Sequence, residues 1–156
     1  MSIFTNKYTV LLDEKNRCVL PASFKKELGD DQKLVIERDA FKKCLNLYPV
    51  AEWQNRVKKI RKKFTHDDPR QSDYLSRYFE EIVTVTLSEI GRITFPKEMI
   101  EYAGIKKEML FACQCTLIKV WNSDSHAQAR MNDEEFAEMT KKILGSESDF
   151  FLLEEL

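Results

Sequence analysis

The chain has 156 residues, of which 43% are hydrophobic and ten are phenylalanine, and its formal net charge is −1. This length provides a core for one domain, or for two small halves that share one, and the apolar fraction argues against disorder. No apolar run approaches the roughly 20 residues of a membrane span, and the N-terminus lacks a signal-peptide layout, so we expect a cytoplasmic protein. Four cysteines in apolar or strand-like surroundings are expected to be buried, reduced thiols: Cys18, Cys44, Cys113 and Cys115.

The first part of the chain predicts a β-hairpin. Residues 8–12 are β-branched and apolar, which is typical of a strand. Residues 13–16 are typical of a tight turn, because Asp accepts hydrogen bonds from turn amides and Asn tolerates the left-handed conformation. Residues 17–20 then return as the partner strand. A short helix and two strands complete the unit: residues 21–28, which Gly29 ends, residues 33–37 and residues 44–48.

Residues 50–64 predict the most regular helix of the first half. Apolar residues recur there at spacings of three and four, which places them on one face. The other face carries basic residues and no acid: Arg56, Lys58, Lys59, Arg61, Lys62 and Lys63. Such a face either contacts phosphates or is simply solvated. A connector follows, and residues 73–81 predict a second helix.

The second half repeats the order of the first. We expect strands at residues 82–87 and 92–95 around a turn at 88–91, a short helix at 96–104, strands at 109–113 and 116–121, and a last helix at about 133–144 that ends at Gly145. Residues 146–156 are acidic with an apolar centre. They are either flexible chain or a segment that docks on a neighbouring subunit.

These two halves align at one fixed offset. The segment 12–21 corresponds to the segment 87–96, and the same offset places Arg17 on Arg92 and Pro21 on Pro96. We interpret the chain as a tandem duplication. The halves differ in charge, since residues 1–78 carry 17 Lys and Arg against 11 Asp and Glu, and residues 79–156 carry 8 against 15. A basic half can face a polyanion while the acidic half is solvated or meets a partner, although the asymmetry can also be incidental.

Residues that would support catalysis are sparse. The Cys113-x-Cys115 pair lacks a second ligand pair at zinc-like spacing, and nothing pairs a cysteine with His66 or His126 as a nucleophile. The four glycines form no phosphate-binding loop. We therefore expect no enzyme, no metal, no cofactor and no small-molecule substrate.

Several motifs together resemble the MraZ family, which belongs to the AbrB-like (SpoVT-AbrB) group of bacterial DNA-binding proteins. They are Asp13-x-x-x-Arg17 followed by an apolar-Pro-Ala segment, Leu47-Tyr48-Pro49 with Trp53 shortly after, and Gly91-Arg92-Ile93 followed by Phe95-Pro96. The resemblance covers roughly residues 3–143. It implies an α+β fold in which two swapped-hairpin β units pack into a pseudo-two-fold, barrel-like core with flanking helices. The corresponding parts are a first repeat with its helix (3–64), a connector with a helix (65–81), a second repeat with a helix (82–144) and a tail (145–156).

This resemblance also implies a sequence-specific transcriptional regulator, usually a repressor. Such proteins form rings and bind repeated boxes of double-stranded DNA in the promoter of the division and cell-wall gene cluster, which implies a nucleoid-associated protein. The family's Asp-x-x-x-Arg turn is associated with DNA contact. We accordingly expect DNA contacts at Asp13, Lys15, Asn16, Arg17 and Arg92, with Ser88, Glu89 and Gly91 forming the second turn.

The chemistry of the first turn fits that role. Asp13 would fasten the turn and fix the point at which Arg17 leaves the strand, and an Arg side chain pairs two acceptors of guanine or phosphate at once. Lys15 would add a phosphate contact that carries little sequence information. The alternative is an exposed Asp13–Arg17 ion pair with no further role, which contributes at most about 1 kcal/mol. Ser88 replaces the acid in the second turn, so the second turn has the weaker case. An antitoxin-like protein-interaction module remains the rival function.

Overall fold

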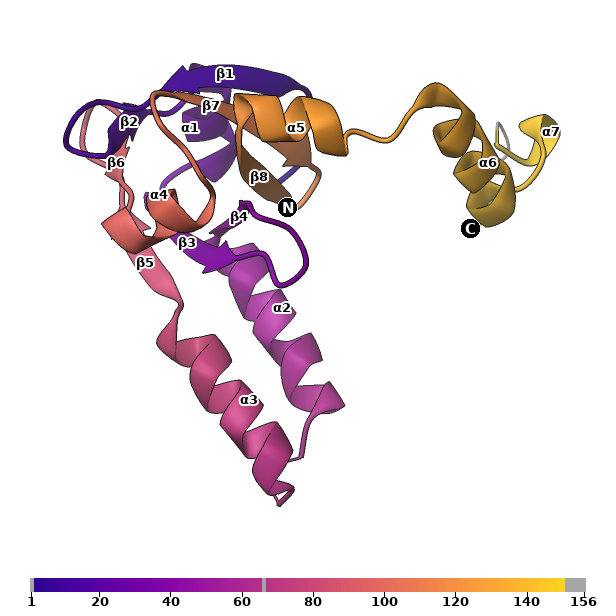
Figure 1. Ribbon diagram of the computed structural model, residues 1–156, viewed down its shortest axis with the longest axis horizontal. Coiled ribbons are helices and arrows are strands. Elements are labelled where there is room, and N and C mark those ends of the chain that lie inside the picture. The colour runs from indigo at the N-terminus through magenta and orange to yellow at the C-terminus, as the bar shows by residue number, and fades with distance from the viewer. Residues whose placement is uncertain (1, 66, 151–156) are drawn as a thin grey trace. The chain divides into compact units, whose positions relative to one another are not determined.

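The computed structural model describes residues 2–65 and 67–150 and has a mixed α+β fold (Figure 1). The chain forms two compact units, Met1–Ser125 and His126–Leu156, and each is described by itself. The strands are β1 (Lys7–Leu11), β2 (Arg17–Val19), β3 (Lys33–Arg38), β4 (Leu45–Pro49), β5 (Val83–Thr86), β6 (Arg92–Thr94), β7 (Glu108–Gln114) and β8 (Leu117–Asn122). The helices are α1 (Ala22–Leu28), α2 (Val50–Lys63), α3 (Pro69–Glu80), α4 (Lys97–Tyr102), α5 (Ser123–Ala129), α6 (Asp133–Leu144) and α7 (Glu147–Phe150).

An antiparallel six-stranded sheet in the order β1-β7-β8-β4-β3-β5 forms the main layer, and β2 and β6 form a separate two-stranded ribbon. Strands β1 to β4 of the first repeat correspond to β5 to β8 of the second. Replacing each strand of the sheet by its counterpart gives β5-β3-β4-β8-β7-β1, which is the observed order in reverse. The register agrees, since the offset that relates Arg17 to Arg92 converts the pair Tyr8–Phe111 into the pair Val83–Ile36. The fold therefore has internal pseudo-two-fold symmetry. Its edge strands β1 and β5 do not pair with each other in the described structure, so hydrogen bonds do not close a barrel.

The expectation that residues 8–12 and 17–20 pair as a hairpin is wrong. β1 pairs with β7 and β2 pairs with β6, so each strand finds its partner in the other repeat, and β5 likewise pairs with β3. The turn does reverse the chain, since the Asp13 amide donates to the Arg17 carbonyl at 2.9 Å. Beyond this bond the two strands diverge. Each repeat is too small to bury its own apolar faces, and pairing across the repeats lets both contribute to one core.

Side chains from both repeats fill this shared core. Phe24 of α1 packs against Phe4 at a centroid distance of 5.5 Å and stacks on Phe111 of β7 at 6.0 Å. Phe95 and Met109 of the second repeat are equally buried in the same cluster. Removing a large aromatic side chain from such a core typically costs about 3–5 kcal/mol. Neither repeat is therefore expected to keep this packing alone.

Helices α2 and α3 run away from the sheet as an antiparallel pair, here called the arm (Figure 1). The prediction of a helix at residues 50–64 is confirmed by α2. Helix α3 begins earlier than the predicted residue 73, because Pro69 occupies its first turn and the Asp68 side chain accepts a hydrogen bond from the Arg70 amide at 2.9 Å. Pro and Asp are favoured at these positions, so this start was readable from sequence.

Two other expectations concern the cysteines and the end of the chain. Cys18 and Cys44 are buried and Cys113 is half-buried, but Cys115 is exposed at a bend with φ of 61°, so the expectation of burial is wrong for Cys115 and only partly met by Cys113. Helix α6 confirms the predicted last helix and its end at Gly145. Helix α5 was not predicted, and residues 151–156 of the tail lie outside the described residues. The proposed repeat boundaries stay predictions.

Candidate nucleic-acid interface

The first turn is held by the carboxylate of Asp13. One oxygen, Oδ1, accepts hydrogen bonds from the backbone amides of Lys15 and Arg17, both at 2.9 Å. The other, Oδ2, accepts from Nε of the Arg17 side chain at 2.8 Å. Asn16 takes the left-handed conformation, with φ of 59°, that lets the chain reverse. The predicted fastening of the turn by Asp13 is therefore present in atomic detail.

The pKa of Asp13 is lowered from its ordinary value. The hydrogen bond from the Arg17 amide lowers the pKa of Asp13 most, the small loss of hydration opposes it, and the Arg17 side chain and the Lys15 amide lower the pKa further. The ion pair uses only Nε of Arg17. Within the described part of the chain the terminal amino groups of that guanidinium have no partner, so they are available to an outside acceptor. The ion pair and a role in binding are compatible.

Ser88 holds the second turn in a simpler way. Its hydroxyl accepts a hydrogen bond from the Arg92 amide at 3.0 Å, and Gly91 takes a left-handed φ of 79°. Lys25 of α1 lies over this turn, because its Nζ donates to the Glu89 carbonyl at 3.2 Å. A Cβ on Gly91 would lie 2.6 Å from Cδ of Lys25. The left-handed backbone favours glycine at this position, and a side chain there would displace the flexible side chain of Lys25.

The β2–β6 ribbon brings the two turns onto one structure. Arg17 lies opposite Thr94, and Arg92 lies opposite Val19. Because directly opposed residues of an antiparallel pair point to the same face, these four side chains share one face of the ribbon. Cys18 and Ile93 point to the other face and are 3% and 1% exposed.

The two arginines are consequently diagonal neighbours, with Cβ atoms on the order of 7–8 Å apart. The guanidinium of Arg92 forms no ion pair with any described residue, and Val19 beside it is 50% exposed. The expectation placed Arg17 and Arg92 on separate hairpin tips. Their meeting on one face follows from the exchange of strands between the repeats, which no local sequence pattern reveals.

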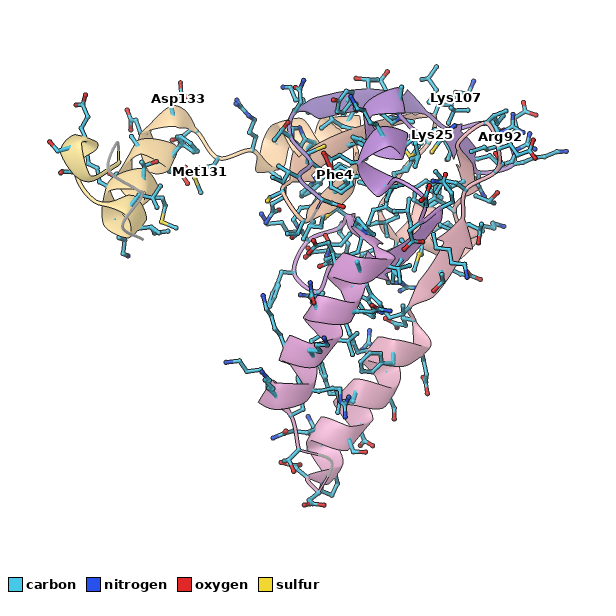
Figure 2. All side chains as sticks on the ribbon, turned by 180° about the vertical axis from the view of Figure 1, so that it is seen from behind. Phe4, Lys25, Arg92, Lys107, Met131 and Asp133 are labelled. Carbon is cyan, nitrogen blue, oxygen red and sulfur yellow. The ribbon has the colours of Figure 1, made fainter. Side chains whose placement is uncertain are left out.

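Two lysines that were not among the predicted DNA contacts lie next to this face. Figure 2 shows Lys25, Arg92 and Lys107 at the same end of the first unit. Lys25 contacts the second turn, and the carbonyl of Lys107 accepts a hydrogen bond from the Leu12 amide at 2.7 Å, immediately before the first turn. Each turn also carries an exposed acid, Glu14 or Glu89, so the surface is basic but mixed.

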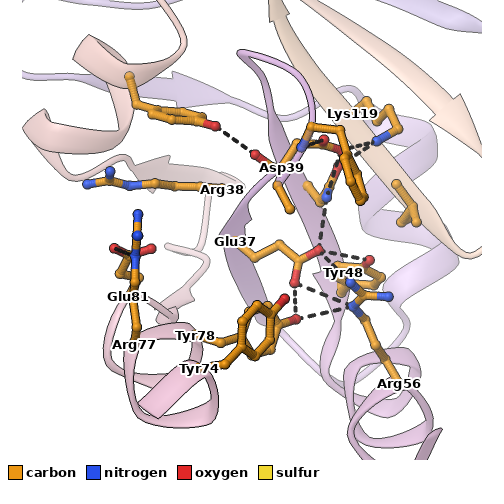
Figure 3. Close-up of a pocket in the computed structure, with 15 residues that line it drawn as sticks. Glu37, Arg38, Asp39, Tyr48, Arg56, Tyr74, Arg77, Tyr78, Glu81 and Lys119 are labelled. Carbon is orange, nitrogen blue, oxygen red and sulfur yellow. Dashed lines mark hydrogen bonds and ion pairs between the residues drawn. The ribbon is translucent and has the colours of Figure 1, made fainter. Parts of the chain in front are cut away.

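A second polar cluster, also unpredicted, lies where the arm meets the sheet (Figure 3). Glu37 of β3 is only 2% exposed. Its carboxylate accepts hydrogen bonds from Asn46 Nδ2 (2.9 Å), Arg56 Nη2 (3.1 Å), the Tyr48 hydroxyl (3.3 Å) and the Tyr78 hydroxyl. Burial raises the pKa of Tyr48 and of Tyr78, and Glu37 adds to both effects. These hydrogen bonds offset the cost of burying the Glu37 carboxylate, and they join β3 to both helices of the arm.

Beside this cluster Asp39 forms a second set of bonds. Burial alone would raise the pKa of Asp39, but hydrogen bonds from Lys119 Nζ at 2.6 Å and from the Phe41 and Lys42 amides hold it at about 2. Side chains from both clusters line a pocket of about 560 Å³. The carboxylates of Glu37 and Asp39 are already paired with donors from within the two clusters, which favours a structural role for them. The described residues contain no cluster of three metal-ligating side chains, and no described helix is both long and apolar enough to cross a membrane.

Comparison with known proteins decides the family. Residues 3–74 match the family model described as "MraZ protein, putative antitoxin-like". A protein of Clostridium acetobutylicum named "Transcriptional regulator MraZ" is 30% identical over 142 residues, which cover 90% of this chain and 96% of that protein. The chain belongs to the MraZ family.

Other MraZ proteins match at similar length. The protein of Christiangramia forsetii is 27% identical over 143 residues, covering 90% of this chain and 92% of the relative. The protein of Flavobacterium psychrophilum is 26% identical over 153 residues, covering 96% of each chain. Both are named transcriptional regulators, so the expectation that this MraZ-family chain is not an enzyme is confirmed.

Proposed function

We propose that this chain is a sequence-specific, DNA-binding transcriptional regulator that uses the exposed face of the β2–β6 ribbon to contact DNA. The observation that carries the proposal is the placement of Arg17 and Arg92 on one face of a two-stranded ribbon, with terminal guanidinium nitrogens that pair with no described residue. The major groove of B-DNA admits a two-stranded β-ribbon, and arginine pairs with the O6 and N7 atoms of guanine. The names of the relatives support a role in transcription.

Each residue of the interface has a separate task in this proposal. Asp13 fixes the first turn and the departure point of Arg17. Lys15 contacts phosphate, as do Lys25 and Lys107 beside the ribbon, and these contacts add affinity without sequence information. Ser88, Glu89 and Gly91 shape the second turn and place Arg92. Asn16 supplies the left-handed residue, and its carbonyl accepts a hydrogen bond from Phe95 at 2.8 Å, which extends the ribbon.

One ribbon offers few contacts, so we propose that several act together on a ring-like homo-oligomer. Linked sites bind repeated DNA boxes with an affinity well above that of a single site, without any new contact. The resemblance points to the promoter of the division and cell-wall gene cluster and to repression, in the cytoplasm at the nucleoid. This arrangement would also explain how a chain of net charge −1 holds a polyanion.

The test is DNA binding by arginine variants. Fluorescence anisotropy with a fragment from upstream of the protein's own gene should show at least tenfold weaker binding for Arg17→Ala and for Arg92→Ala. The matched control is Arg70→Ala, which removes an exposed arginine from the first turn of α3. The logarithm of the binding constant decreases linearly with the logarithm of the salt concentration. If one arginine contacts phosphate, the slope of this line should be less steep by about 0.9 in its variant. Unchanged affinity in both ribbon variants would refute the proposed interface.

The second candidate is a protein-interaction module of the antitoxin type. The description of the family model favours it, as do the acidic residues and the apolar centre of the segment 146–156. A pull-down with the full chain and with a chain lacking residues 146–156 separates the candidates. Capture of a protein partner by the full chain alone, without binding to the upstream fragment, would favour the interaction module.

A further inference from the structure

Helix α6 is well defined by its own sequence but contains no buried residue. The Asn132 side chain caps the first turn by accepting a hydrogen bond from the Glu135 amide at 2.9 Å, and it is held in place by donating to the Glu135 carboxylate at 2.8 Å. Phe136 and Ile143 are each 67% exposed, and Met139 is 43% exposed. Positions i, i+3 and i+7 lie on one side of a helix, so these three residues form an exposed apolar stripe.

Local signals alone rarely stabilise such a helix. An isolated helix of 12 residues is marginal in water, and most helices in proteins are stabilised by packing of an apolar face. The first turn of α6 is acidic, with Asp133, Glu134 and Glu135. The stripe and this charge together specify the chemistry of a partner: an apolar groove with a basic border.

The arm offers a surface of that chemistry. Only Leu75 is buried among the residues of its two helices. Phe64, Leu75 and Phe79 line a groove of about 260 Å³ between α2 and α3, and Arg61 lies at its margin. Lys58 lies one helical turn before Arg61 on the exposed side of α2, so the border of the groove is basic.

We propose that α6 of one chain docks with its apolar stripe in the Phe64–Phe79 groove of a second copy's arm. Apolar stripe meets apolar groove, and the acidic first turn of α6 meets the basic side of α2. The lengths agree, since α6 and α3 each have 12 residues and extend about 18 Å. The inference rests on the proposed ring and deepens it, because a contact between two different surfaces repeats from chain to chain and generates a ring when the rotation closes.

Pairing of α6 with α6 of another copy would cover only one of the two exposed apolar surfaces. It would join two short helices and leave the aromatic surface of the arm exposed, and so small a contact falls well short of the area that a stable interface buries. Docking on the arm covers both exposed apolar surfaces at once. Each contact is still modest, and closure of a ring is what would make the assembly stable.

The test compares assembly of full-length variants by size-exclusion chromatography with light scattering. One variant carries Phe136→Ser and Ile143→Ser on α6, and the other carries Lys58→Glu and Arg61→Glu on the arm. Wild type should form a higher oligomer, and each variant should assemble at least tenfold more weakly. The control Phe41→Ser makes the same kind of change at a residue that is 95% exposed and lies outside both surfaces, and it should assemble like wild type. Circular dichroism establishes that all chains are folded.

Mixing the two variants gives the sharpest outcome. Each variant retains the surface that the other has lost, so an equal mixture should recover pairs of one chain of each kind. Normal assembly of the arm variant would overturn the inference in favour of α6–α6 pairing. A mixture that forms no pairs would overturn it in favour of docking within one chain or on an unrelated partner.

DNA binding separates this inference from the proposed function. If wild type binds the upstream fragment while both variants assemble normally, the docking inference fails and the proposed function stands. If the variants assemble as expected but wild type binds no DNA, the proposed function fails and the docking contact stands.

Discussion

Replacing Glu37 by glutamine should weaken the attachment of the arm to the sheet. Glu37 bonds to β4, α2 and α3 together, through Tyr48, Arg56 and Tyr78. Its partners among the described residues all donate hydrogen bonds to it. Glutamine keeps the size and shape of the side chain but replaces one accepting oxygen by an NH2 group that faces donors.

The magnitude follows from two losses. A charge-assisted hydrogen bond such as that to Arg56 contributes about 1.5–3 kcal/mol, and a buried donor without an acceptor costs about 1–3 kcal/mol. The Arg56 side chain is 40% exposed, so water compensates for part of the lost charge. The two tyrosine hydroxyls can also rotate to accept. We therefore expect Glu37→Gln to lower the free energy of unfolding by about 2–3 kcal/mol.

Urea unfolding at one fixed protomer concentration measures this loss. Tryptophan fluorescence is the reporter, and Trp53 contributes to it from the arm, where its ring centroid lies 5.9 Å from that of Tyr48 and 6.2 Å from that of Tyr78. The matched control is Glu81→Gln, which breaks an exposed ion pair with Arg77 and should cost at most about 1 kcal/mol. If the two variants differ by less than about 0.5 kcal/mol, the reasoning about the buried carboxylate is refuted.

Three further predictions follow from single sites. Because the pKa of Asp39 is lowered from 3.8 to about 2, its ionised form stabilises the fold above pH 4, and this contribution is lost as pH falls toward 2. The free energy of unfolding of Asp39→Asn, measured between pH 4 and pH 2, should therefore fall less with pH than that of wild type. Gly91→Ala should cost about 1–2 kcal/mol through its left-handed backbone and additionally displace Lys25, whereas Gly104→Ala, with no atom within 4 Å, should show the backbone cost alone in urea unfolding. Thiol labelling of the native protein with Ellman's reagent should show a rapid phase from the exposed Cys115, and this phase should vanish in Cys115→Ser; a rapid phase that survives would show that another thiol is accessible.

Local patterns were sufficient to place the main elements. The apolar spacing of residues 50–64 predicted α2, and Gly145 predicted the end of α6. The turn chemistry of Asp13 was also legible, because an Asp side chain and the amides two and four residues later need only local geometry to meet. The fixed offset between the repeats reappears in the register of the sheet.

Pairing of the strands could not be read in this way. Alternation along β2 shows that Cys18 is buried and Arg17 is not, but it does not say which strand lies alongside. A hairpin with β1 is the nearest choice in sequence, and β6 is the choice that lets two small repeats bury their apolar faces together. Glu37 was overlooked for a related reason, since its donors come from three elements up to 41 residues away.

The sequence by itself thus determined the duplication, the identity of the two turns and the arginine that follows each. Those features depend on contacts within a few residues. Only the tertiary structure decided that Arg17 and Arg92 lie on one ribbon face, because that placement depends on exchange of strands between the two halves of the chain. Burial of the shared core drives this exchange of strands. Because of the exchange, the two turns lie on one ribbon and form one candidate surface for DNA.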